Sequence, residues 1–387
     1  MPGNGKPALE GVVVVDLSRV LSGPYCTAML ADLGATVIKI EGKQGDDARH
    51  LGPFRNGQSI YFAILNRGKQ SLALDLRDPH DLQLLRLLVR HADVLVENFR
   101  PGVAARLGIT YEDLRKPNPG LIYASISGFG QTGPQAGRPA YDLVVQAESG
   151  LMHQTGWPDG PPTRVGESLG DLHAGVVTAF AISAALYARA RDGLGTHLDI
   201  SMLEGLLSLQ VTGISQLNAS GEAPRRVGNR HPVSTPFDTY AAADGLVVLA
   251  VANEAGFAKL AALMGEPDMP ADPRFATDQA RTEHEPEVRR RIERWTKPLS
   301  VAEVVKRATE AGVAASPIRD LAQALDGPQV RARGAVKEMR HPELGTVRYV
   351  PLPVRMSART QAHPDPSPGL DQDRQRLLDW LEERPAN

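Results

Sequence analysis

The chain of 387 residues has almost no cysteine and no excess of charge of either sign. Cys26 is the single cysteine, so the chain cannot form an internal disulfide, and a reducing, cytoplasmic setting is expected. Lysine and arginine total 43 and aspartate and glutamate total 45, with the two signs interspersed. This balance excludes the basic groove of a nucleic-acid-binding protein and gives no sign of attraction to an anionic membrane.

The sequence also lacks signals for membranes and metals. The opening MPGNGKPALEG does not have the charged and then apolar plan of a secretion signal. The longest nearly apolar run, Val176–Ala188, is too short to span a bilayer and indicates a buried helix, so we expect a soluble protein with no membrane partner. The ten histidines are scattered without metal-ligand spacing, and no metal is expected.

Short β-branched runs alternate with longer helical segments over the first half of the chain. The run GVVVVDLS at 11–18 is continuously apolar, as expected for a parallel strand that is covered on both faces. A helix is expected over 78–92, where Asp78 suits the N-cap and Pro79 the first helical position. This alternation predicts an α/β fold with a Rossmann-like parallel sheet. The further strands are expected at 35–41, 70–76, 93–99, 121–127 and 196–202, with helices at 24–34 and 203–217.

The first turn of this predicted sheet does not carry a dinucleotide-binding fingerprint. It reads SRVLSGP (18–24) instead of G-x-G-x-x-G, and Pro24 stands where a dinucleotide fold needs free amide donors. Glu41, at the end of the second strand, imitates the acid that binds the ribose of NAD, but it is weak evidence without the glycines. A nicotinamide cofactor is therefore not expected.

A chain of this length exceeds what one hydrophobic core usually fills, so two domains are expected. The stretch NASGEAPRRVGNRHPVSTP, at 218–236, is rich in Gly, Pro, Ser and Arg and is predicted to be the linker. After the linker, the sequence predicts a hairpin that turns at Asp244 and Gly245, followed by amphipathic helices.

An aspartate opens the most apolar segment of the chain, ESLGDLHAGVVTAFAISAALYARA at 167–190. The simplest interpretation is that Asp171 caps a helix and accepts amide hydrogens of its first turn. However, Ala174 stands where a capping box would place Glu or Gln, and Gly170 and Gly175 would leave room for another group to approach. A cap and a functional acid both remain open at this point.

Several longer stretches carry a resemblance to a known family. In their order and spacing, they resemble the class III CoA-transferases, which include formyl-CoA transferases, carnitine CoA-transferases and alpha-methylacyl-CoA racemases. The resemblance covers nearly the whole chain. The stretches are VVDLSRVLSGPYCTAMLADLGATVIKIE, ENFRPGVAARLG, SISGFGQTGP and GDLHAG, followed by GNRHP, DPRFAT and HPELGTV.

The resemblance implies both the domain plan and the assembly. Residues 1–217 would form the N-terminal part of a large Rossmann-like, CoA-binding domain, and residues 329–387 would return to it. Residues 237–328 would form a smaller α+β domain. Two such chains would interlock as a homodimer.

The resemblance also implies the site. Asp171, in GDLHAG, would be the nucleophile that attacks an acyl-CoA thioester and forms a mixed anhydride and then an enzyme–CoA thioester. Gly170 and Gly175 would let backbone amides approach the developing oxyanion. CoA would bind along the loops after the strands, with guanidinium groups on its phosphates. The implied CoA-binding residues are Arg19, Val20, Leu21, Ser22, Leu74, Arg77, Asn98, Phe99, Arg106 and Arg138.

The region around Tyr141 favours CoA transfer over racemisation. In the racemases, a histidine in a G-H-D word and an aspartate act as paired acid and base. Here the equivalent word is AYDLVV, and Tyr141 replaces the histidine. A tyrosine hydroxyl, with an ordinary pKa of about 10, is a poor base near neutrality. We therefore expect Tyr141 to line the substrate site, with racemase activity as the alternative within the family.

The acceptor acid is predicted less directly. Formyl-CoA transferases carry a glycine-rich loop where this chain reads RVGNRHPVSTPFD, which makes oxalate a less favoured acceptor. A larger dicarboxylic acid, with succinyl-CoA as donor, is expected instead. Arg230 and His231 would then meet its distal carboxylate. A CoA- or nucleotide-binding protein without turnover is the alternative from another class of proteins.

Overall fold

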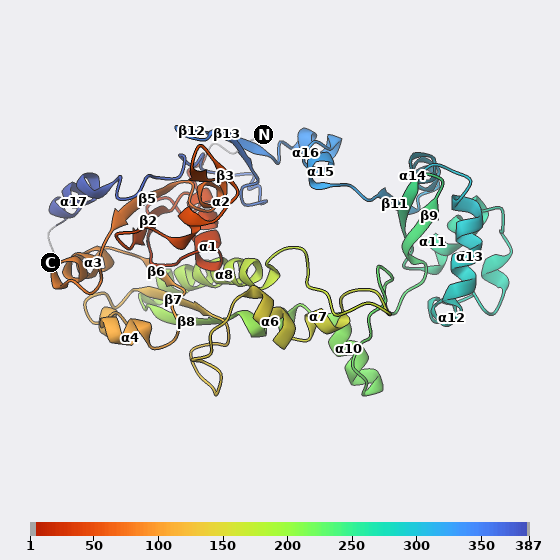
Figure 1. The fold of residues 1–387 in the computed structure, drawn as a ribbon, viewed down its shortest axis with the longest axis horizontal. Coiled ribbons are helices and arrows are strands. Elements are labelled where there is room, and N and C mark those ends of the chain that lie inside the picture. Colours follow the sequence, from red (N-terminus) through yellow and green to blue (C-terminus); the bar gives the residue numbers. More distant parts are fainter. Residues whose placement is uncertain (1–4, 385–387) are drawn as a thin grey trace. The chain divides into compact units, whose positions relative to one another are not determined.

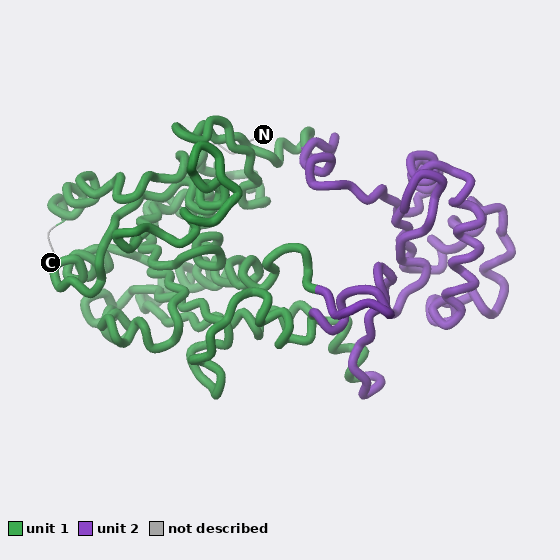
Figure 2. Tube along the Cα trace, viewed as in Figure 1, with its two compact units in different colours: residues 1–151, 164–218, 331–387 green, residues 152–163, 219–330 purple. Residues whose placement is uncertain are grey.

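The computed structural model describes residues 5–384, which form two compact units (Figure 2). Unit 2 contains Met152–Thr163 and Ala219–Val330, and the other described residues make up unit 1. The chain therefore leaves unit 1 twice and returns to it twice. The sequence prediction placed residues 152–163 in the large domain, whereas in the structure they belong to unit 2.

A parallel sheet of six strands forms the centre of unit 1 (Figure 1). The strand order is β5-β2-β1-β6-β7-β8, which is the order of the Rossmann fold, so the predicted α/β fold is confirmed. β1 and β6 are parallel, and the order of the strands reverses between them. Ligands bind such sheets at the carboxyl ends of the strands beside this point. The strands are β1 (Val13–Asp16), β2 (Thr36–Glu41), β5 (Lys69–Ala73), β6 (Val94–Glu97), β7 (Ile122–Ser127) and β8 (Thr196–Ser201).

Strand β1 shows why the sequence of this sheet is apolar without alternation. Val14 packs with α1 (Ser22–Asp32) and α8 (Leu169–Asp192) on one face, and Val15 packs with α3 (Pro79–Arg90) on the other. Both valines are fully buried. The predicted start of α3 is confirmed, because the Asp78 side chain accepts the amide hydrogens of His80 and Asp81.

Helix α8 is longer than the apolar run that predicted it. It has 24 residues, and by length and composition alone it is apolar enough to cross a bilayer. Gly175 and Ile182 are buried against the rest of unit 1. The side chains of Val176, Phe180 and Tyr187 are 46%, 74% and 69% exposed. Helix α8 therefore covers one face of the sheet and leaves a second apolar face uncovered.

One predicted helix of unit 1 is divided into two. The sequence predicts a single helix over 203–217, whereas the structure has α9 (Met202–Ser208) and α10 (Val211–Ser220). The break falls at Gln210, whose side-chain amide donates to the carbonyls of Ser149 and Leu206. This contact with a distant segment competes with helix continuation.

Shorter elements complete unit 1. They include the helix η1 (Asp47–His50), the strands β3 (Phe54–Arg55) and β4 (Gln58–Ser59), and α2 (Ile60–Leu65). They also include α4 (Val103–Leu107), α5 (Tyr111–Leu114), α6 (Asp142–Glu148), the strands β12 (Lys337–His341) and β13 (Gly345–Tyr349), and α17 (Arg374–Glu382). Helices α7 (Leu151–Gln154) and α16 (Pro328–Arg333) lie at the unit boundaries.

Unit 2 contains an antiparallel sheet of order β11-β10-β9. The hairpin predicted at Asp244 and Gly245 is confirmed, since Ala242 pairs with Gly245 at the start of the β9–β10 ladder. Helices pack on this sheet around a core that includes Tyr240 and Phe257. The strands are β9 (Phe237–Ala242), β10 (Gly245–Ala250) and β11 (Ala314–Pro317). The helices are α11 (Glu254–Leu263), η2 (Met269–Ala271), α12 (Asp278–Glu283), α13 (Glu285–Thr296), α14 (Val301–Glu310) and α15 (Leu321–Leu325).

Candidate active site

The loop after β1 and the first residue of α1 contain four of the residues that the resemblance places on CoA, from Arg19 to Ser22. Val20 has a φ of +65°, a left-handed conformation that is strained for a β-branched residue. Its amide donates to the Asp46 carboxylate at 3.0 Å, and Asp46 forms a buried ion pair with Lys39 at 2.7 Å. A buried ion pair thus holds the loop in its strained shape.

Asn98 joins this loop to the one after β6. Its side-chain oxygen accepts from the Arg19 amide at 2.8 Å, and its nitrogen donates to the Arg19 carbonyl at 2.8 Å. The same nitrogen lies 3.3 Å from the Ser22 hydroxyl oxygen. Asn98, predicted to bind CoA, therefore uses both the oxygen and the nitrogen of its side-chain amide to link the two loops at the point where the strand order reverses.

A cavity of about 220 Å³ opens at the carboxyl ends of β1, β2 and β5. It brings together four of the predicted CoA-binding residues, namely Arg19, Leu74, Arg77 and Phe99. The two guanidinium groups make only solvent-exposed ion pairs, Arg19 with Asp47 at 3.3 Å and Arg77 with Asp75 at 3.0 Å. Such pairs are weak, so both cations can turn to a phosphate.

Charged residues of β2 also line this cavity, and the sequence prediction missed their role. Glu41 makes a bidentate pair with Arg49, at 2.7 Å for each bond, and accepts from the Ser71 hydroxyl. Both oxygens of the Glu41 carboxylate therefore already accept hydrogen bonds within the protein, which indicates a structural role and not the binding of a ribose. The fully buried Lys39 also lines the cavity. A lysine inside the apolar strand TVIKIE was the sequence signal for a buried ion pair.

Two predicted CoA-binding arginines do not line this cavity. Arg106 is exposed near the end of α4. Arg138 pairs with Glu148 at 3.0 Å, donates to Gln135 and lies over the ring of Phe129. Their assignment to CoA stays a prediction.

Asp171 lies in the first turn of α8 but does not cap it. The helix begins at Leu169 and its N-cap residue is Ser168, so the interpretation of Asp171 as the N-cap is wrong. The partly buried Asp171 carboxylate accepts a hydrogen bond from the Ser22 hydroxyl. Ser22, predicted to bind CoA, thus contacts Asp171 and Asn98, and connects the switch-point loops to the carboxylate.

The surroundings of Asp171 make it unusually basic. Burial raises the pKa of Asp171, the nearby Asp142 carboxylate raises it further, and the Ser22 hydrogen bond opposes both, giving a pKa of about 6. Tyr61 of α2 faces the same group, because burial and then the charge of Asp171 raise the pKa of its phenol. Asp171 is therefore mostly ionised at neutral pH, yet more basic than an ordinary aspartate.

The glycines beside Asp171 serve packing, which corrects the predicted open space. A Cβ at Gly170 would lie 2.9 Å from the Val145 side chain, and a Cβ at Gly175 would lie 2.7 Å from the Ser22 carbonyl. The Gly170 amide is already bound to Asp142 at 2.7 Å, so it is not free to stabilise an oxyanion. The protein's own atoms fill the space that was predicted for substrate.

The predicted substrate residues lie in different parts of the chain. Tyr141 is 75% exposed and directly precedes α6 in unit 1. Arg230 and His231 belong to unit 2, where the His231 ring lies 5.3 Å from that of Phe237. His173 is two residues beyond Asp171 on α8, so the two side chains point to different faces. Burial lowers the pKa of His173, which favours the neutral form of its imidazole.

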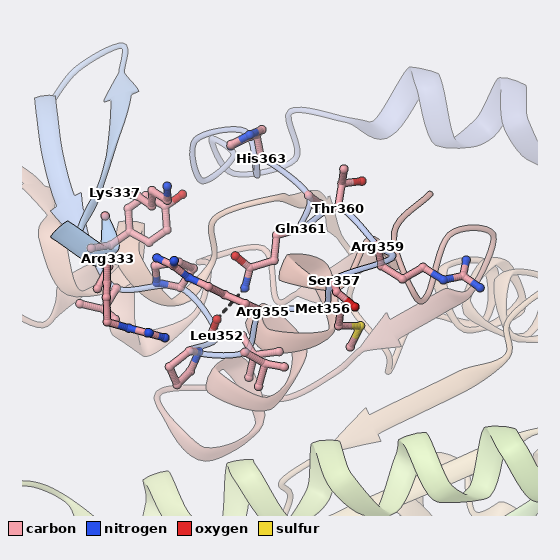
Figure 3. A pocket seen from close by; sticks show the side chains of 18 residues that line it. Arg333, Lys337, Leu352, Arg355, Met356, Ser357, Arg359, Thr360, Gln361 and His363 are labelled. Atoms are coloured by element: carbon pink, nitrogen blue, oxygen red, sulfur yellow. Dashed lines mark hydrogen bonds between the residues drawn. The ribbon is translucent and has the colours of Figure 1, made fainter. Parts of the chain in front are cut away.

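A larger cavity, of about 660 Å³, lies in the C-terminal segment of unit 1 (Figure 3). Figure 3 shows Arg333 and Lys337 at one end of its lining and Arg359 at the other. The residues predicted to bind CoA or substrate are not among those that line it. Cavity size alone therefore does not identify the site.

A partly buried carboxylate of raised pKa is thus linked through Ser22 and Asn98 to the loops at the carboxyl ends of the sheet, where ligands bind folds of this kind. The described residues contain no cluster of three His, Cys, Asp or Glu side chains that could hold a metal ion. The chain belongs to CoA-transferase family III, whose model matches residues 9–374.

Individual relatives agree with this family. The chain is 44% identical to the acetyl-CoA:oxalate CoA-transferase of Acetobacter aceti, over 96% of this chain and 95% of the relative. It is 38% identical to the succinate–glutarate CoA-transferase of Agrobacterium fabrum, over 98% and 97%. A CAIB/BAIF family protein from Brucella suis has a similar crystal structure, with a TM-score of 0.85, 36% identity and coverage of 97% and 100%.

Proposed function

We propose that this protein transfers CoA from an acyl-CoA to a free dicarboxylic acid, with Asp171 as the transient carrier. The observation that carries this proposal is the basic Asp171 carboxylate, linked through Ser22 and Asn98 to the loops at the switch point of the sheet. The nucleotide end of CoA would use the cavity lined by Arg19, Leu74 and Arg77.

The reaction would proceed in four balanced displacements. A carboxylate oxygen of Asp171 attacks the thioester carbon, the carbon–sulfur bond breaks, and CoA thiolate leaves a mixed anhydride. The thiolate attacks the aspartyl carbonyl, which gives an enzyme–CoA thioester and releases the donor acid. The acceptor carboxylate then attacks this thioester, and the thiolate returns to the new acyl group. Asp171 is regenerated, and water must be excluded while the anhydride exists.

The names of the relatives support a dicarboxylic acceptor. The Acetobacter aceti relative is named for oxalate and the Agrobacterium fabrum relative for succinate and glutarate, and all three are dicarboxylic acids. The higher identity of the oxalate enzyme weakens the expectation that oxalate is disfavoured. Oxalate therefore stands beside the longer acids as a candidate acceptor, and Arg230 and His231 remain the proposed partners of the distal carboxylate.

We further propose a homodimer. Helix α8 exposes Val176, Phe180 and Tyr187, and α10 exposes Val211 and Ile214, by 68% and 45% for the last two. Exposed apolar side chains in such number mark an association surface. Sedimentation analysis should give twice the mass of 41.6 kDa, and Phe180→Asp should shift the protein toward the monomer.

Mass spectrometry of CoA exchange tests the activity directly. Acetyl-CoA and succinyl-CoA serve as donors, and oxalate, succinate and glutarate serve as acceptors. We expect at least one new acyl-CoA with the native protein and a loss of roughly 10³-fold or more with Asp171→Asn. The acid limb of kcat/KM should fall near pH 6, because the attacking carboxylate must be ionised. Asp192→Asn, an exposed acid at the other end of α8, is the matched control and should react normally.

The same assay separates the alternatives. Equal product from the native protein and from Asp171→Asn would refute the carboxylate as nucleophile. Inversion at the α-carbon of a 2-methylacyl-CoA, without exchange, would identify a racemase. CoA binding without any reaction would identify a binding protein.

A further inference from the structure

The first turn of α8 is capped by a residue from a different helix. Its own N-cap residue, Ser168, makes no side-chain hydrogen bond to the turn. The Asp142 carboxylate, 28 residues earlier in the chain, accepts the Gly170 amide hydrogen at 2.7 Å. Asp142 is the first residue of α6 and only 6% exposed. This bond fixes the Leu169–Gly170 peptide unit, one residue before Asp171.

A second buried side chain holds Asp142 in place. The other oxygen of Asp142 accepts from the Gln146 amide nitrogen at 2.7 Å. The Gln146 oxygen accepts from the Val165 amide at 3.0 Å, and its nitrogen also lies 3.3 Å from the Glu167 carbonyl. Helix α6 therefore orients both the segment that leads into α8 and the turn that presents Asp171.

The charge of Asp142 is not neutralised. Over residues 5–384, no lysine, arginine or histidine forms an ion pair with it, and its partners are the neutral Gly170 amide and Gln146 side chain. The other groups that face Asp171 are the Ser22 hydroxyl of α1 and the Tyr61 phenol of α2, and Glu167 lies near Tyr61. These groups bring no cation, so two carboxylates share one partly buried site.

On this geometry, and resting on the proposed function, we propose that Asp142 is a positioning residue for CoA transfer, which aligns Asp171 through Gly170 and keeps a second negative charge beside it. The consequence follows from the charges along the reaction. Asp171 is negative as a free carboxylate but neutral in the anhydride and in the CoA thioester. Acylation therefore removes the repulsion between the two acids. The like charge favours the covalent states over the resting enzyme.

Three variants separate alignment from charge. Asp142→Asn keeps an oxygen that accepts the Gly170 amide but removes the charge and the acceptor of the Gln146 amide, and Asp142→Ala removes all three. Asp142→Ser keeps a short oxygen suited to helix capping and serves if the asparagine variant does not fold. Asp192→Asn is the control for loss of an acid from the same helix.

The primary measurement is the titration of Asp171 by carbon NMR in protein labelled at aspartate carboxyls, with the signal assigned by its loss in Asp171→Asn. The midpoint in Asp142→Asn should fall by roughly half a pH unit or more, and it should stay above that of an ordinary aspartate because burial remains. An unchanged midpoint would overturn the proposal. This readout needs no turnover, so it stands even if the proposed function fails.

Kinetics supply the second measurement. In Asp142→Asn, the acid limb of kcat/KM should move to lower pH together with the NMR midpoint, and less enzyme–CoA thioester should be trapped by hydroxylamine at steady state. Asp142→Ala should lose more thermal stability than Asp142→Asn, because the asparagine loses the bond to Gln146 but keeps the bond to the Gly170 amide. Equal pH profiles and equal trapped fractions in the native enzyme and Asp142→Asn would show that Asp142 is only a structural cap.

Discussion

Two buried acids of unit 1 differ in how their charges are compensated. Asp16, at the end of β1, is fully buried and bonded to Lys69 at 3.0 Å and to the hydroxyls of Ser18 and Thr27. Burial alone would raise the pKa of Asp16, but Lys69, then Lys39 and the hydroxyls lower it to about 2. Asp171 has a second carboxylate beside it instead of a cation, and its pKa is about 6.

This difference indicates that the neighbours, more than burial, decide the role of an acid. The Asp16 cluster supports the loop after β1, since Lys69 also binds the Pro24 carbonyl, at the start of α1, at 3.1 Å. The charges of this cluster are paired with one another and stabilise the fold. The Asp171 charge is left unpaired, which costs stability and preserves reactivity.

The largest effect on stability is expected at the compensated site. Asp16→Asn should lower the free energy of unfolding at pH 7.5 by about 3 to 5 kcal/mol, because it leaves the Lys69 ammonium buried without its counter-ion. Urea unfolding measures this loss. Glu10→Gln, which breaks the exposed pair with Lys6, is the control and should leave the midpoint unchanged. A similar midpoint for the Asp16 variant and this control would end the comparison.

The opposite sign is expected at the uncompensated site. The folded pKa of Asp171 lies above its unfolded value, so the native state binds a proton that the unfolded state does not bind between pH 4 and 6. The cost of ionising Asp171 is absent below this window and complete above it. Asp171→Asn should therefore raise the free energy of unfolding by about 2 to 3 kcal/mol at pH 8 while abolishing transfer. The gain should disappear at pH 4, and a loss of stability at pH 8 would contradict the unpaired charge.

The smallest effect on stability is expected at the contact between α1 and α8, where Gly175 lies against Ser22. Gly175→Ala places a methyl group against the Ser22 carbonyl, so α1 and α8 must separate slightly, at a cost of about 1 to 3 kcal/mol. Transfer activity should fall as well, because Ser22 bonds to Asp171. Gly137→Ala meets open space and is the control. A Gly175→Ala variant with native stability and rate would show that this contact can relax.

The sequence predicted most of the fold because its signals are local. Apolar runs of β-branched residues marked the strands, Asp78 and Pro79 marked the start of α3, and Asp244 and Gly245 marked the hairpin. The division of α9 from α10 could not be predicted, since it depends on contacts of Gln210 with a carbonyl far away in the chain.

The site was predictable only in part for the same reason. The resemblance assigned Arg19, Leu74, Arg77 and Phe99 to CoA, and the structure brings these four to one cavity. The capping of Gly170 by Asp142 depends on tertiary packing between residues 28 positions apart, and no local sequence pattern predicts it. The resemblance assigned Ser22 to CoA together with Arg19, Val20 and Leu21, whereas the structure gives its hydroxyl a hydrogen bond to Asp171.

The short segment between β1 and α1 has two duties. Its backbone borders the proposed nucleotide cavity, and it positions Ser22, the first residue of α1, whose hydroxyl bonds to the carboxylate proposed to react. A substitution that reshaped this segment to bind a molecule other than CoA would therefore also change the orientation of the Asp171 carboxylate. We therefore expect sequence differences among enzymes with this arrangement to be concentrated where the acid substrates bind, while the preference for CoA stays the same.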